Sequence, residues 1–239
     1  MSNRCGLSLI RMSNILIFDL DDTLYPELTY VQSGFTAVAN GLMKLYGWDP
    51  NETFSFMQNV LFTMGRGAVF DTLLEFHGVL TKKAVRNCVS LYRQHNPNIK
   101  LSVESEVFLS RWPTKPYLVT DGNKIVQAKK IEALGLRPRL KKAYITHRYG
   151  VACAKPSLHC FELIRRGESC EWPDLIYVGD NPAKDFVSLN SLGAKTIRVL
   201  TGEHRNILAK QGFDAHYTIN SINELEELLR CSPDFSFSH

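Results

Sequence analysis

The sequence lacks long hydrophobic runs and any marked excess of one charge. No apolar segment approaches the ~18 residues that a helix needs to cross a bilayer. The 28 Lys and Arg residues stand against 24 Asp and Glu residues, so the net charge is only +4. Nothing in the sequence resembles the concentrated basic face of a duplex-binding protein. We therefore expect neither a membrane nor a nucleic-acid polymer among its partners.

Cysteine is sparse as well, with six in 239 residues and no C-x-x-C pair. One group of His and Cys residues comes nearest to a zinc site, but its spacing matches no zinc pattern. It consists of His147, Cys153, His159 and Cys160. The N-terminal apolar run is too short for a secretory signal peptide, and Met12 offers a second start codon. These features predict a cytoplasmic protein with reduced thiols.

What the sequence does contain is a series of short apolar runs separated by helical segments. Such runs are typical of strands buried on both faces of a parallel sheet. They cover residues 15–18, 117–119, 143–145, 175–178 and 196–199. Ser221 and Glu224 are spaced as a capping box at the start of the last helix. The alternation predicts an α/β fold with a doubly wound, mostly parallel sheet.

The alternation is interrupted once, between residues 26 and 96, where the pattern is purely helical. Apolar residues step at four and three positions from Val31 to Leu45, and Gly47 is placed as a helix stop. We expect an all-helical insertion after the first strand, over the edge of the sheet where such folds bind ligands. The predicted division is a core of 13–25 and 97–230, a helical domain of 26–96, and flexible tails of 1–12 and 231–239.

Four polar segments follow the expected strands or open the expected helices. They are 19–24, 120–123, 155–156 and 179–185. Because the carboxyl ends of parallel strands meet at one edge of a sheet, these segments are expected to converge on one crevice.

The convergence would bring several acids together, namely Asp19, Asp21, Asp180 and Asp185. A pair of like charges ~4 Å apart costs on the order of 4 kcal/mol at an effective dielectric constant of 20. One lysine, Lys155, cannot balance four anions, so the cluster predicts a hard divalent cation. Oxygen ligands favour Mg²⁺.

A carboxylate on such a metal, beside a lysine and the hydroxyl of Thr120, is suited to receive a phosphoryl group. An aspartate can then form an aspartyl phosphate that water cleaves. Asp21 lies two residues beyond Asp19, and side chains alternate with period 2, so both are expected on the same side. Asp21 is thus a candidate general acid and base.

In order and spacing, the four segments resemble the signature motifs of the haloacid dehalogenase-like hydrolase superfamily along nearly the whole core. The resemblance implies that Asp19 is the nucleophile and that Asp21 is the acid/base, its backbone carbonyl also reaching the metal. Thr120 would hydrogen bond the phosphoryl oxygens, and Lys155 would hold nucleophile and phosphate together. Asp180 would complete the protein ligands of Mg²⁺.

The same resemblance implies a supporting role for Asp185, which would orient a metal-bound water or Lys155. The helical insertion corresponds to the cap that closes over the substrate in this superfamily. Four further residues are candidate substrate contacts, although Asn123 also fits a helix cap and Arg66 a simple helix break. They are Asp121, Gly122, Asn123 and Arg66.

Dehalogenases of the superfamily lack the acid/base aspartate, so Asp21 favours phosphoryl transfer. Residues 21–25 and 179–182 look most similar to the pyrimidine nucleotidase-like and acylneuraminate phosphatase-like branches. Asp22 is interpreted as a turn residue, and Lys184 and Arg93 as solvated side chains.

The resulting hypothesis is a Mg²⁺-dependent phosphatase that forms an aspartyl phosphate on Asp19. Its substrate would be a small phosphorylated metabolite, either a sugar phosphate or a nucleoside monophosphate. Two alternatives stay open: a phosphomutase of the same superfamily, and a non-enzymatic module that binds a phosphorylated ligand.

Overall fold

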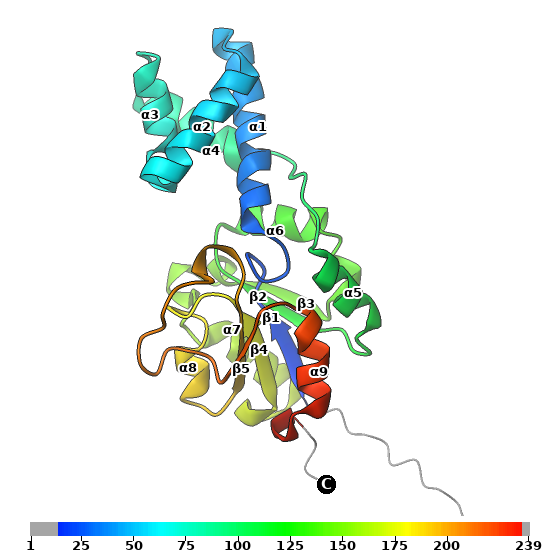
Figure 1. Ribbon diagram of the computed structural model, residues 1–239. Coiled ribbons are helices and arrows are strands. Elements are labelled where there is room, and N and C mark those ends of the chain that lie inside the picture. The colour runs from blue at the N-terminus through cyan, green and yellow to red at the C-terminus, as the bar shows by residue number, and fades with distance from the viewer. Residues whose placement is uncertain (1–13, 236–239) are drawn as a thin grey trace, which may run out of the picture.

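A parallel sheet forms the centre of the computed structural model, which describes residues 14–235 (Figure 1). Within these residues the sheet has six strands in the order β3-β2-β1-β4-β5-β6, and every neighbouring pair is parallel. The strands are β1 (Ile15–Phe18), β2 (Tyr117–Thr120), β3 (Lys142–Ile145), β4 (Leu175–Gly179), β5 (Lys195–Val199) and β6 (Tyr217–Ile219). The predicted α/β fold class is confirmed. The predicted tail 1–12, with Met12, lies outside the described residues.

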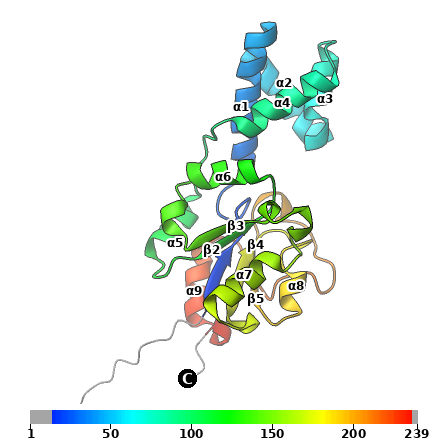
Figure 2. The ribbon, with the colours of Figure 1, turned by 180° about the vertical axis from the view of Figure 1, so that it is seen from behind.

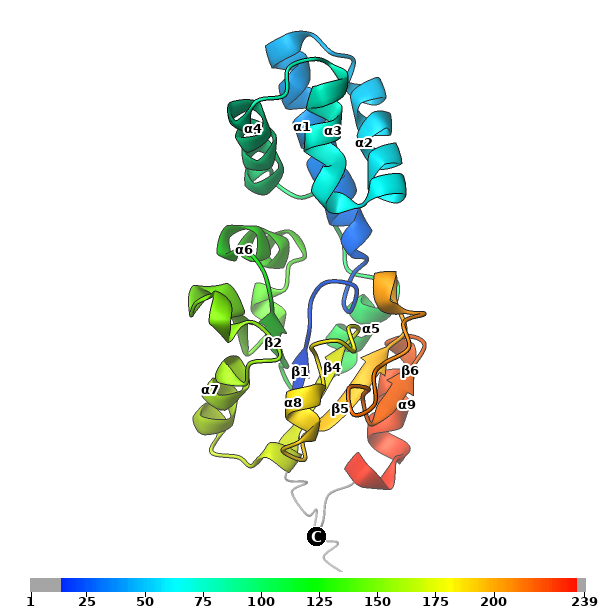
Figure 3. The same ribbon diagram turned by 90° about the vertical axis from the view of Figure 1, so that its left-hand side faces the viewer.

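Helices cover both faces of the sheet because successive side chains of each strand point to opposite sides. In β1, Leu16 and Phe18 join a core with α5 (Val103–Arg111), α6 (Lys124–Ala133) and α9 (Asn223–Cys231). Ile17 joins a second core with α7 (His159–Glu168) and α8 (Val187–Asn190). Figure 3 shows these two layers on either side of the strands.

The segment between β1 and α5 folds as a separate helical unit beyond the carboxyl ends of the strands (Figure 1). It comprises α1 (Glu27–Tyr46), α2 (Pro50–Met64), α3 (Val69–Phe76) and α4 (Lys82–Gln94). These helices bury an apolar core of their own, and α4 contacts α6 of the sheet domain (Figure 2). None of the helices in residues 14–235 combines the length and hydropathy that a membrane crossing requires.

The first of these helices follows the predicted pattern except at one position. Val31, Phe35, Val38 and Leu42 are buried, and α1 ends at Gly47, whose φ of 75° is the left-handed conformation that glycine adopts readily. Leu45, which the spacing places on the same stripe, is 57% exposed. It lies in the last turn of α1, beyond the reach of the helices that cover the rest of the stripe.

Two predictions for the C-terminal region are wrong. Residues 231–235 are not a flexible tail: the side chain of Phe235 is buried in the sheet core, and its carbonyl accepts a 3.1 Å hydrogen bond from Asn14 Nδ2. The capping box is also absent from the last helix. The Glu224 carboxylate accepts a hydrogen bond from the N–H of Asn220 rather than from that of Ser221. Helix α9 begins at Asn223.

Helix α1 packs closely against α4 at Gly34. A methyl group at Gly34 would overlap the ring of Tyr92, which other aromatic rings hold in place. We expect Gly34→Ala to lower the free energy of unfolding by about 1–3 kcal/mol, because the core would be overpacked. Gly167→Ala, in α7 with open space around it, is the matched control and should raise that free energy by about 0.4–1 kcal/mol. Urea denaturation measures both, and equal effects would contradict the packing argument.

Candidate active site

The ends of β1 and of its two neighbours, β2 and β4, bring predicted residues together at one edge of the sheet. Asp19 directly follows β1, and its N–H donates to the carbonyl of Val178 in β4. Thr120 is the last residue of β2, and Asp180 directly follows β4. Because β1 lies between β2 and β4, these three side chains leave adjacent strand ends.

Lys155 enters the site from the segment that follows β3. Its Nζ lies 2.9 Å from Asp19 Oδ1 and 2.7 Å from Asp185 Oδ1, and all three side chains are buried. It also donates to the hydroxyl of Tyr177 at 2.8 Å. The ammonium group therefore holds Asp19 and Asp185 together from one side.

One ammonium group does not balance the buried negative charge. Carboxylate oxygens of Asp19, Asp180 and Asp185 lie within 4.8 Å of one another. Burial, with repulsion from the other two carboxylates, raises the pKa of Asp180 to about 9. Burial likewise raises the pKa of Asp19 to about 6, although Lys155 opposes the rise. This shortage of positive charge and the all-oxygen ligand set fit a hard divalent cation beside Asp19 and Asp180.

A histidine that the sequence analysis missed lies next to this cluster. His204 Nδ1 is 2.7 Å from Asp180 Oδ2, and its Nε2 is 3.0 Å from the amide nitrogen of Asn181. His204 belongs to the short 3₁₀ helix Gly202–His204, far along the chain from the acidic motif. It orients the Asp180 carboxylate, and no sequence spacing pointed to it.

Asp21 lies outside the cluster of three carboxylates that the described residues form. Its Oδ1 accepts from the hydroxyl of Tyr25 and from Lys130 Nζ, both at 2.6 Å. Its Oδ2 accepts from Gln127 Nε2 at 2.9 Å, and the same amide lies 2.6 Å from Thr120 Oγ1. Asp21 is thus positioned by α6, whose buried Gln127 and Lys130 were not predicted as site residues.

Two of the candidate substrate contacts have structural partners. The Asp121 carboxylate accepts from Thr146 Oγ1 at 2.8 Å, from the N–H of Lys155 at 3.1 Å and from Lys184 Nζ at 3.1 Å. Asp121 therefore fixes the segment that carries Lys155, and the interpretation of Lys184 as solvated is wrong. Asn123 accepts from two backbone N–H groups in the first turn of α6, which confirms the helix-cap alternative.

Asp22 shapes the turn that follows Asp19, as predicted. Its φ is 53°, and its carboxylate accepts from the N–H groups of Glu27 at 2.7 Å and of Glu203 at 3.3 Å. The hydroxyl of Thr201 donates to its carbonyl. These bonds join the start of α1 to the segment that carries His204.

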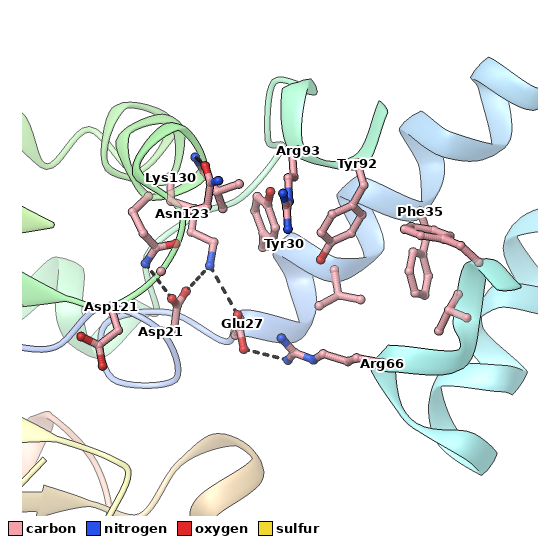
Figure 4. Close-up of a pocket in the computed structure, with 16 residues that line it drawn as sticks. Asp21, Glu27, Tyr30, Phe35, Arg66, Tyr92, Arg93, Asp121, Asn123 and Lys130 are labelled. Carbon is pink, nitrogen blue, oxygen red and sulfur yellow. Dashed lines mark hydrogen bonds and ion pairs between the residues drawn. The ribbon is translucent and has the colours of Figure 1, made fainter. Parts of the chain in front are cut away.

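A cavity of about 300 Å³ separates the sheet domain from the helical unit (Figure 4). Asp21, Gly122 and Lys130 line it from the sheet domain, and Arg66 and Tyr92 from the helices. The guanidinium group of Arg66 pairs with Glu27 at 2.7 Å and with Glu203 at 3.3 Å.

The ion pairs on this wall of the cavity change the titration of Glu27. Burial alone would raise its pKa, but hydrogen bonds and charges from Arg66 and Lys130 outweigh burial and lower the pKa below the ordinary value. Glu27 therefore stays ionised at neutral pH and keeps both cations in place.

Comparisons with known proteins agree with this geometry. Residues 152–225 match the family described as HAD-hydrolase-like. The chain is 28% identical over 231 residues to the glyceraldehyde 3-phosphate phosphatase of Methanocaldococcus jannaschii, covering 90% of this chain and 96% of that protein. It is 24% identical to the enzyme of the same name from Methanopyrus kandleri, covering 92% and 98%. The magnesium-bound HAD-hydrolase YfnB of Bacillus subtilis has a similar fold, with a TM-score of 0.63 at 18% identity, covering 91% and 98%.

The carboxylate cluster makes stability depend on pH and on magnesium. The pKa values of Asp19 and Asp180 lie above the ordinary value, so the metal-free folded protein binds more protons than the unfolded chain. We therefore expect its Tm to fall as the pH rises from about 5.5 to about 8.5. Added Mg²⁺ should raise the Tm, and more at the higher pH, because the ligands must be deprotonated.

Matched variants attribute this effect to the cluster. Asp180→Asn should raise the free energy of unfolding of the metal-free protein by roughly 1–3 kcal/mol at the higher pH and remove most of the response to Mg²⁺. Asp71→Asn, which changes an exposed acid of α3, should alter neither. A wild-type Tm that is insensitive to Mg²⁺ would show that the cluster holds no such cation.

Proposed function

We propose that this chain, which belongs to the haloacid dehalogenase-like hydrolases, is a Mg²⁺-dependent phosphoric monoester hydrolase that works through an aspartyl phosphate on Asp19. The observation that carries the proposal is the buried contact of Asp19 with Lys155, beside Asp180 and two residues before Asp21, which lines the cavity. The names of the two archaeal relatives support the same reaction class.

Asp19 is equipped to attack phosphorus at neutral pH. Its pKa of about 6 leaves it mostly ionised, and Lys155 holds one carboxylate oxygen at 2.9 Å. The attack forms a bond from a carboxylate oxygen to phosphorus and breaks the ester P–O bond. Asp19, Asp180 and the backbone carbonyl of Asp21 would hold Mg²⁺, which supplies charge neutralisation and orientation of the phosphate.

The charge on the phosphoryl oxygens also needs hydrogen-bond donors. Thr120 Oγ1 lies at the end of β2, beside the turn of Asp121 and Gly122, whose N–H groups complete the set. Gly122 has a φ of 124°, a conformation in which glycine exposes its backbone without steric cost. The donors come from a rigid strand end, so they are positioned before the substrate arrives.

Asp21 acts as the acid and then as the base. In its protonated form it gives a proton to the departing oxygen of the ester, and it later takes one from the water that cleaves the aspartyl phosphate. This second step releases phosphate and restores Asp19. Lys130 and Gln127 keep the Asp21 carboxylate beside the cavity where the leaving group lies.

The size of the cavity favours a short substrate. About 300 Å³ lies at the low end of the range for small-molecule sites. A sugar phosphate of a few carbons fits this space better than a nucleoside monophosphate, whose base and ribose need more room. Helices α1–α4 would act as the cap, because α1, α3 and α4 line the cavity opposite the sheet domain and would exclude water when the substrate is bound.

Phosphate release in the presence of Mg²⁺ tests the function. With p-nitrophenyl phosphate, Asp19→Asn should lower kcat by at least about 1,000-fold because the nucleophile is lost, and Asp21→Asn by about 100- to 10,000-fold. Asp71→Asn is the control and should retain full activity. Wild-type release no faster than that of Asp19→Asn would leave the binding-module alternative, and isomerised sugar phosphate without free phosphate would indicate a phosphomutase.

A further inference from the structure

The charges that line the cavity between the two units are almost all paired. Arg66 pairs with Glu27, and Lys130 pairs with Asp21 at 2.6 Å and with Glu27 at 3.4 Å. Arg93, in the last turn of α4, lines the same cavity but has no carboxylate partner among residues 14–235. It is therefore the cation of the cavity that is available to a ligand, and its side chain is exposed, as the sequence predicts.

The neighbours of Arg93 are built to receive a polar group. Figure 4 shows the Arg93 side chain between the rings of Tyr30 and Tyr92. The rings of Tyr30 and Tyr92 pack edge to face with their centres 5.5 Å apart. Lys130 Nζ lies 4.4 Å from the centre of the Tyr30 ring. Within the described residues neither tyrosine hydroxyl hydrogen bonds to another side chain, so both are free to bind a ligand.

We propose that Arg93 is a specificity-determining residue that binds a carboxylate of the leaving group. The preferred substrate is then a short phosphorylated hydroxy acid, with its phosphate toward Asp19 and its carboxylate toward α4. This inference rests on the proposed phosphatase function and names the substrate class within it. An arginine pairs with a carboxylate through two parallel hydrogen bonds, and the two tyrosines suit the hydroxyl groups between the ends of the molecule.

The orientation follows from where each group of the site lies. The phosphoryl group is bound by Thr120 and Lys155 at the strand ends, and the departing oxygen faces Asp21. Asp21 and Arg93 line the same cavity, one from the sheet domain and one from α4. A leaving group that extends from Asp21 into the cavity therefore reaches Arg93 with its far end. A carboxylate at that end would supply the charge that Arg93 lacks.

Two esters with the same carbon skeleton test the inference. 3-Phosphoglycerate and glyceraldehyde 3-phosphate differ only in having a carboxylate or an aldehyde at the end remote from phosphate. With Mg²⁺, we expect wild-type kcat/KM to be at least about 10-fold higher for 3-phosphoglycerate. Arg93→Gln should lower that value about 10- to 100-fold and leave the value for glyceraldehyde 3-phosphate within about 2-fold.

Arg86→Gln is the matched control, since it removes the same charge from an exposed position of α4 outside the cavity. It should change neither ester, and both variants should keep the wild-type Tm. Three outcomes would overturn the inference: a wild-type preference for the aldehyde, no preference, or an equal loss on both esters in Arg93→Gln. In each case Arg93 would not recognise the carboxylate.

The same assay separates this failure from failure of the proposed function. Hydrolysis of p-nitrophenyl phosphate that Arg86→Gln leaves unchanged and Asp19→Asn abolishes supports the phosphatase, whichever ester is preferred. If the wild type hydrolyses none of the three esters faster than Asp19→Asn does, the phosphatase proposal fails, and the assignment of Arg93 fails with it.

Discussion

The structure depends on one constraint: three carboxylates and one ammonium group are buried together at the edge of a parallel sheet. Lys155 contacts Asp19 and Asp185 directly, while Asp180 is left with a pKa of about 9. Such a cluster is unfavourable without further positive charge. The extensive apolar cores on both faces of the strands offset its energetic cost. The shortage of positive charge is also what suits the site to a cation.

The boundary between the sheet domain and the helical unit combines apolar packing with ion pairs beside a cavity. The helices bury an apolar core of their own, and Tyr30 and Tyr92 also pack against the core of the sheet domain. Ion pairs also join the two units beside a cavity, one between Arg66 and Glu203 and one between Lys130 and Glu27. The exposed pair of Arg66 with Glu203 contributes little to holding the units together, whereas the ammonium group of Lys130 is buried.

Sequence patterns predicted the elements that are long or buried on both faces, and they failed where the signal was short or polar. β6 has three residues with a polar one in the middle, and α5 has little amphipathic contrast, so neither was predicted. The segment 231–235 looked like a tail because its one anchor, Phe235, contributes no periodicity. In the site, Lys130 and His204 went unnoticed because each contacts a carboxylate that is remote in the chain.

By itself, the sequence determined the fold class, the helical insertion and the acidic motifs at the strand ends, because periodicity and short motifs are local properties that a single chain displays. Only the tertiary structure decided that Asp21 turns away from the carboxylate cluster toward Lys130, that Asp121 and Asn123 are engaged in structural bonds, and that Arg93 faces a cavity. These outcomes depend on which charges meet after folding, and the energy of a buried charge is set by its neighbours in space rather than in sequence.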